Sequence, residues 1–180
     1  FLQGSRGRVR ECLESQMTLV GDDETKPNLR IDDFVAPPLI EGRANGIDGR
    51  GSDAHDLSIE SFLARNDNAV VIGSRHSGKS TLAYYSAYML AFGPGLRPQI
   101  PVVIDTRNFR FNAYSIRGQL GELYERSLSN QEAEKYAEEG LFTFLFDNCL
   151  CDEANLKKIA EFANKFTECR CIVFASPNMD

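Results

Sequence analysis

The chain has 180 residues, 42% of them hydrophobic, and its 20 basic and 26 acidic side chains give a formal net charge of -6. That length suits one domain of ordinary size with a buried core. The acidic balance argues against a general nucleic-acid binder, and no apolar run approaches the roughly 18 residues that span a bilayer. The first residues lack the apolar stretch of a secretory signal. We therefore expect a cytoplasmic protein without nucleic-acid or membrane partners, and the absence of a starting methionine indicates a piece of a longer chain.

The N-terminal part differs in character from the rest. Residues 1–30 are polar with mixed charge, and two prolines exclude a helix within residues 31–40. Residues 41–52 are rich in glycine and charge, which is typical of a flexible linker. We predict an N-terminal arm and linker over residues 1–55 and a folded core over residues 56–180.

From residue 56 onward, short apolar runs alternate with helical patterns. Buried parallel strands are expected at 69–72, 100–104, 141–146 and 171–175. Helices are expected at 56–63, 79–92, 114–126, 130–139 and 153–166. This alternation predicts an α/β fold, a doubly wound parallel sheet with helices on both faces, truncated after its fourth core strand.

Two of these helices carry more specific expectations. Asp56 is placed to cap the first helix, which runs through Ile59, Phe62 and Leu63. The apolar face of the last helix is predicted to consist of Leu156, Ile159, Ala160, Ala163 and Phe166.

A phosphate-binding pattern, G-x-x-x-x-G-K-[ST], is satisfied by Gly73-Ser74-Arg75-His76-Ser77-Gly78-Lys79-Ser80, called the Gly73–Ser80 loop below. An apolar strand precedes it and a helical stretch follows, as this P-loop motif requires. The glycines let consecutive amides turn toward an anion, and the positive end of the next helix faces the same point. The loop therefore predicts a nucleotide site.

Individual side chains of this site have distinct expected roles. Lys79 is a compact cation able to reach β- and γ-phosphates, and the Ser80 hydroxyl suits Mg²⁺. Thr81 adds a second hydroxyl for the α-phosphate. His76 is interpreted as lining the loop without a catalytic role. ATP or ADP with Mg²⁺ is the expected ligand.

An acidic residue follows the third apolar run. Asp147 stands directly after Phe142–Phe146, which matches a Walker B element of apolar residues and then aspartate. We expect this strand to lie beside the strand of the loop, which places Asp147 near Ser80 as a magnesium ligand. Asp152 and Glu153 follow, and either is a candidate to polarise the attacking water. The sequence slightly favours Glu153, although it also suits the first turn of a helix.

Two C-x-C pairs, Cys149–Cys151 and Cys169–Cys171, raise the question of zinc. The first pair follows the third strand and the second precedes or begins the fourth. In a parallel sheet those ends are separated by roughly 15 Å for five residues, too far for one tetrahedral site. We expect reduced, partly buried thiols.

Taken together, the loop with its strand, the strand ending in Asp147, and the fourth strand ending Phe174-Ala175-Ser176-Pro177 resemble a STAND-class ATPase, the group that includes NACHT domains. The similarity spans about residues 56–177. The run Pro101-Val102-Val103-Ile104-Asp105 resembles the family's second strand, and Phe34–Leu39 its arm along the nucleotide. The resemblance, to a bacterial-type variant, implies that Ser176 senses the γ-phosphate and that nucleotide switches a larger signalling or defence protein, with self-association through that parent protein.

The sequence departs from the family in two places. Asp152 and Glu153 stand five and six residues after Asp147, where the family has an acidic pair at three and four. No arginine separates Ser176 from Pro177. These departures favour slow hydrolysis.

Two other functions stay open: a small-molecule P-loop kinase, with Arg107, Arg110 and Arg117 as its only candidate lid, and a nucleotide-binding interaction module without turnover. A GTPase is rejected because Asn164-Lys165-Phe166-Thr167 lacks the aspartate of the guanine-binding motif and ends a helix.

Overall fold

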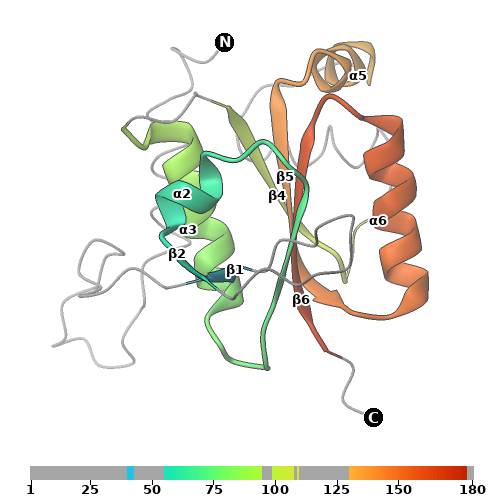
Figure 1. Ribbon diagram of the computed structural model, residues 1–180. Coiled ribbons are helices and arrows are strands. Elements are labelled where there is room, and N and C mark those ends of the chain that lie inside the picture. Colours follow the sequence, from blue (N-terminus) through green and yellow to red (C-terminus); the bar gives the residue numbers. More distant parts are fainter. Residues whose placement is uncertain (1–39, 43–54, 95–98, 108, 110–129, 178–180) are drawn as a thin grey trace, which may run out of the picture.

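The computed structural model describes residues 40–42, 55–94, 99–107, 109 and 130–177. Their centre is a sheet of four parallel strands (Figure 1). The strands lie in the order β3 (Ala69–Ile72), β6 (Arg170–Ser176), β5 (Phe142–Leu150) and β4 (Ile100–Asp105). The prediction of an α/β fold with a parallel sheet is confirmed.

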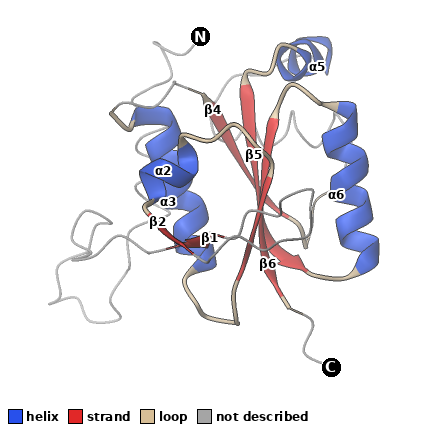
Figure 2. Ribbon diagram, in the orientation of Figure 1, coloured by secondary structure: helices blue, strands red, loops and turns tan. Residues whose placement is uncertain are grey.

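Helices cover both faces of this sheet (Figure 2). On one face lie α2 (Ile59–Leu63) and α3 (Lys79–Phe92), and on the other lies α6 (Glu153–Lys165). The fourth described helix, α5 (Asn130–Glu138), lies at the end of the sheet where β5 begins. The chain steps from β3 across to β4 and then returns through β5 to β6. Right-handed connections in opposite directions put their helices on opposite faces.

Most predicted elements are found within a residue or two of their expected bounds. The helix expected at 114–126 lies outside the described residues. Within the described part of the chain, no helix is both long and apolar enough to cross a membrane.

The expected cap at Asp56 is wrong. Asp56 lies in a short strand, β2 (His55–Leu57), which pairs antiparallel with β1 (Ile40–Gly42). Ser58 caps α2 instead, and its side chain accepts a hydrogen bond from the Ser61 amide at 3.2 Å. The β1–β2 pairing crosses the predicted boundary between residues 55 and 56; the division into arm and core stays a prediction.

The expectation that the strand at 69–72 is buried is only half correct. Val70 and Ile72 are 54% and 65% exposed. Through β6, Val70 is in register with Val173 and so shares the sheet face of Phe146, the face that α6 covers. The strand β3 is at the edge of the described sheet, so α6 does not cover its side chains on that face.

Aromatic rings fill the layer between the sheet and α6. Phe162 packs edge-on against Phe144 with ring centroids 4.9 Å apart, and against Phe146 at 5.5 Å. The predicted face of this helix needs correction. Leu156 and Ala160 are exposed, whereas the buried residues are Ile159, Phe162 and the C-cap Phe166. The buried face of α6 is centred on the large Phe162 ring, and Leu156 lies outside that face.

A buried arginine joins the start of β6 to α2. Arg170 is 5% exposed and donates to three backbone carbonyls, those of Asp67 at 2.9 Å, Leu63 at 2.9 Å and Phe62 at 3.0 Å. Two of these carbonyls are at the C-terminal end of α2, where the helix dipole favours a cation. Burial lowers the pKa of Arg170 from its usual value, but carbonyl oxygens replace the water that the guanidinium loses.

We predict that Arg170→Ala lowers the free energy of unfolding by roughly 3 kcal/mol, because it leaves these carbonyls without their donor. Arg65→Ala is the matched control, since the Arg65 side chain is 50% exposed and its ion pair with Asp67 spans 3.8 Å. Removing such a surface pair changes stability by about 0.5 kcal/mol. Urea denaturation midpoints of both variants test this, and equal losses would contradict it.

Candidate functional site

The Gly73–Ser80 loop connects the carboxyl end of β3 to the first turn of α3. Its start is tied to the neighbouring strand, because the Gly73 amide donates to the Ala175 carbonyl at 3.1 Å. A Cβ at Gly73 would lie 2.6 Å from Ser77 Oγ, so a larger residue here would displace the Ser77 side chain. Gly78, the N-cap of α3, has φ 82° and needs glycine for its backbone conformation.

His76 also has a left-handed backbone, with φ 59°. This conformation is uncommon for a residue with a side chain and often marks a functional loop. The side chains from Ser74 to Gly78 are exposed, as are Ser80 and Thr81. The loop therefore presents its predicted ligand-binding residues to solvent at the carboxyl edge of the sheet, where open α/β sheets bind ligands.

The ammonium group of Lys79 lies against the backbone of the loop. Its Nζ donates to the carbonyl oxygens of Gly73 at 2.9 Å and Ser74 at 2.6 Å, and to Ser77 Oγ at 3.4 Å. The side chain is half-buried. A positive charge is thus held at the loop by its own carbonyl groups, next to the N-terminus of α3.

Asp147 meets this loop through a hydrogen bond from Ser80 Oγ to Asp147 Oδ1 at 3.1 Å. The contact agrees with the expected proximity, but the expected adjacency of the two strands is wrong, since β6 lies between β3 and β5. Ser80 reaches Asp147 across β6 because α3 crosses the sheet on its way from β3 to β4 and contacts β6, β5 and β4. Its first turn reaches over β6 toward the end of β5.

The strand β5 does not end at Asp147 as expected. It continues to Leu150 through an irregularity between Phe146 and Cys149, after which Leu150 pairs with Ser176. Asn148, in the irregular stretch, has φ 56°, a conformation that asparagine tolerates better than most residues. Its amide donates to Asp147 Oδ2 at 3.3 Å. The irregular stretch thus supplies a donor to Oδ2 of Asp147, while Ser80 donates to Oδ1.

Because β5 continues for three residues after Asp147, Asp152 and Glu153 lie beyond the end of the strand, away from Asp147. Both carboxylate oxygens of Asp152 accept hydrogen bonds from Asn155, one from its backbone at 2.7 Å and one from its side chain at 2.6 Å. Asp152 is therefore the N-cap of α6. Glu153 is the exposed first residue of that helix. Their proposed role with water stays a prediction.

Ser176 ends β6, between the loop and Asp147. It is partly buried, and its carbonyl accepts from the Cys151 amide at 3.0 Å. The central position of β6 places Ser176 at the same sheet edge as both predicted elements. Its role as a sensor stays a prediction.

Sequence reasoning missed a polar cluster beside Asp147. Asp105 is in register with Asp147, and Arg107 holds it through a side-chain contact in which Nε donates to Oδ1 at 2.9 Å. The Arg107 guanidinium lowers the pKa of Asp105, and an Asn148 hydrogen bond acts in the same direction. Thr106 donates from its backbone and from its hydroxyl to the Asp147 carbonyl, each at 3.0 Å. The available signal in the sequence was an acidic residue directly after the apolar run of the second predicted strand.

The four described cysteines are free thiols in two separate places. Cys149 is in register with Ala175, near the end of β6, whereas Cys171 is in register with Phe144. The register therefore keeps the two C-x-C pairs apart along the strands, as expected. Among the described residues, no group of three or more histidine, cysteine or acidic side chains is arranged to hold a metal ion.

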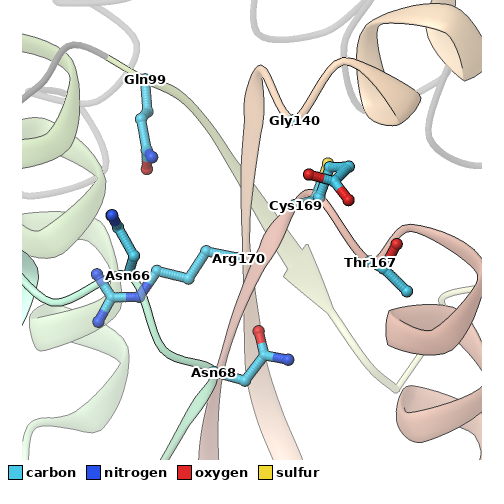
Figure 3. Close-up of a pocket in the computed structure, with 8 residues that line it drawn as sticks. Asn66, Asn68, Gln99, Gly140, Thr167, Cys169 and Arg170 are labelled. Carbon is cyan, nitrogen blue, oxygen red and sulfur yellow. The ribbon is translucent and has the colours of Figure 1, made fainter.

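A hollow of about 220 Å³ lies at the edge of the sheet opposite the Gly73–Ser80 loop, where the strands begin (Figure 3). It is lined by Asn66, Asn68, Gln99, Gly140, Thr167, Glu168, Cys169 and Arg170. Polar groups that line it bind the surrounding backbone: Asn68 Oδ1 accepts from the Cys171 amide at 2.8 Å, and Arg170 Nε donates to the Asp67 carbonyl at 2.9 Å. We assign this hollow a structural role, because ligands of open α/β sheets bind at the other edge.

No protein-family model matches the sequence, and no curated protein matches it at a significant level. Function is therefore inferred from the arrangement of the residues themselves.

Thiol reactivity is predicted to differ among these cysteines. Burial raises the pKa of Cys149 and Cys169 to about 11 and that of Cys171 to about 12. Only thiolate reacts with iodoacetamide, so at about pH 8 we expect labelling of these three to be at least about tenfold slower than in denaturant. Cys151, which is only partly buried, should react faster than the other three. Peptide mass spectrometry resolves each site, and uniform labelling of the folded chain would contradict the assigned burial.

Proposed function

We propose that this chain binds Mg-ATP and hydrolyses it slowly, as the nucleotide switch of a larger STAND-type signalling or defence protein. The observation that carries this proposal is the hydrogen bond between Ser80 of the glycine-rich loop and the buried carboxylate of Asp147. These residues are far apart in sequence: Ser80 is in the first turn of α3, which follows β3, and Asp147 is on β5, which β6 separates from β3. A phosphate loop and an acidic residue that meet in this way fit the P-loop NTPase fold.

The residues at this contact fit Mg²⁺. Asp147 is 5% exposed, and within the described part of the chain it forms no salt bridge. A buried carboxylate without a direct cationic partner is costly. Hard oxygen ligands such as this carboxylate and the Ser80 hydroxyl suit Mg²⁺, which would supply positive charge for the phosphates.

Other residues of the loop act on the phosphates directly. Lys79 already lies among the loop's carbonyl groups, so it needs only to exchange them for phosphate oxygens. Backbone amides of the Gly73–Ser80 loop and the N-terminus of α3 attract the same negative charge. The protein thereby positions the nucleotide, and the shifted Asp152–Glu153 pair accounts for slow turnover.

The kinase alternative gains no support from the lid residues. Arg107 is engaged by Asp105, and Arg110 and Arg117 lie outside the described residues. An interaction module without turnover differs from the proposed switch only in phosphate release, so the same measurements decide between them.

Lys79→Ala is expected to weaken ATP binding by about 100-fold, because a charged contact to phosphate is lost. Lys158→Ala, a change at an exposed lysine on α6, is the matched control and should bind as the wild type does. Fluorescent-nucleotide titration measures binding, and release of inorganic phosphate measures turnover. If the wild type binds ATP and releases no more phosphate than Lys79→Ala, hydrolysis is refuted and the interaction module is left.

Asp147→Asn should remove most of the effect of Mg²⁺ on ATP affinity while sparing the metal-free affinity. The fold should persist, because the change removes a buried charge and keeps the side chain's shape. Titrations with and without Mg²⁺, together with a thermal unfolding curve, test this. Unchanged magnesium dependence would exclude Asp147 as a ligand.

A further inference from the structure

Asp105, the last residue of β4, is in register with Asp147 on β5. Register partners on parallel strands place their side chains on the same face of the sheet. Asp147 reaches Ser80 at the start of α3, so Asp105 is on the α3 face too. The preceding pair, Ile104 and Phe146, is on the opposite face, where Phe146 packs against α6.

The carboxylate of Asp105 is held in one orientation. Arg107 donates from its backbone amide to Oδ1 at 3.1 Å and from Nε to Oδ1 at 2.9 Å and Oδ2 at 3.1 Å, and its Nη2 contacts Oδ2. The neighbouring carboxylate of Asp147 is held by Asn148, whose side-chain amide donates to Oδ2 at 3.3 Å.

This acidic residue is also open to water. The side chains of Arg107 and Asp105 are 66% and 38% exposed. An ion pair this exposed contributes little to stability. A carboxylate that is fixed, solvent-accessible and on the face of the magnesium ligand is suited to hold a water molecule by a hydrogen bond.

The two acidic candidates from the sequence are less well placed. Asp152 lies beyond the end of β5, where it is the N-cap of α6. Glu153 follows it on that helix, which covers the face of the sheet opposite α3. From Asp147 to Leu150 the strand itself advances roughly 10 Å toward them.

We propose, building on the Mg-ATP hydrolysis inferred above, that Asp105 orients the attacking water and that Arg107 fixes Asp105 for this task. The water oxygen forms a bond to the γ-phosphorus, and the bond from that phosphorus to the bridging oxygen breaks. The electron pair of the broken bond leaves with ADP. Both hydrogens of the water stay on the released phosphate, which then equilibrates with solvent. Asp105 accepts a hydrogen bond from one of them and undergoes no net change.

Asp105→Asn tests this role, because it keeps the shape of the side chain and removes its charge. We expect single-turnover hydrolysis to slow about 100-fold, while the affinity for a fluorescent ATP analogue stays within about threefold of wild type. Asp105→Glu should recover part of the rate. The matched control is Asp67→Asn, a change at a 79%-exposed acidic residue at the other edge of the sheet, which should alter neither quantity.

The outcomes separate this inference from the proposed function. A wild type that hydrolyses ATP, with Asp105→Asn at the wild-type rate and Glu153→Gln slowed, overturns the role of Asp105 and gives it to Glu153. Equal losses of affinity and rate in Asp105→Asn also overturn it, since they indicate a binding or structural role. If the wild type binds ATP but releases no more phosphate than Lys79→Ala, hydrolysis itself fails, and the role of Asp105 fails with it.

Discussion

The candidate site depends on the hydrogen-bonded register of β5 between β4 and β6. This register sets Asp105 beside Asp147 on one side and aligns β5 with β6 on the other, and β6 in turn pairs with β3, from which the Gly73–Ser80 loop begins. Because β5 is buried on both faces by phenylalanines and α3, a slip of one residue would turn Asp147 into the aromatic layer. The packing of Phe144 and Phe146 against α6 therefore fixes the position of a carboxylate on the opposite face.

The irregularity after Phe146 has a specific consequence for this arrangement. It lets β5 continue to Leu150 while Asn148 takes a left-handed backbone and its side chain turns to Asp147. Backbone strain of this kind persists only where surrounding structure holds it. Here the surrounding ladder resumes at Cys149, so the strained residue is held on both sides. The same bulge explains why the acidic pair of the sequence ends up beyond the sheet, with Asp152 capping a helix.

Local patterns were enough to predict most of the helices and strands, because short apolar runs and helical periodicity depend on neighbours in sequence. The loop and Asp147 were found for the same reason, as contiguous motifs. What could not be predicted is set by pairing between distant segments. The place of β6 between β3 and β5 is one case, and the exposure of Val70 and Ile72 at the resulting edge is another. Asp105 was overlooked because its significance comes only from its register with Asp147.

The two edges of the sheet hold buried charged groups in different surroundings. At the amino edge, Arg170 is buried and its charge is met by three carbonyls of the chain itself. At the carboxyl edge, Asp147 is equally buried, and among the described residues its carboxylate receives two neutral hydrogen bonds, from Ser80 and Asn148. A buried carboxylate without a direct cationic partner is costly. This difference between the two edges supports the magnesium site proposed for Asp147 and Ser80.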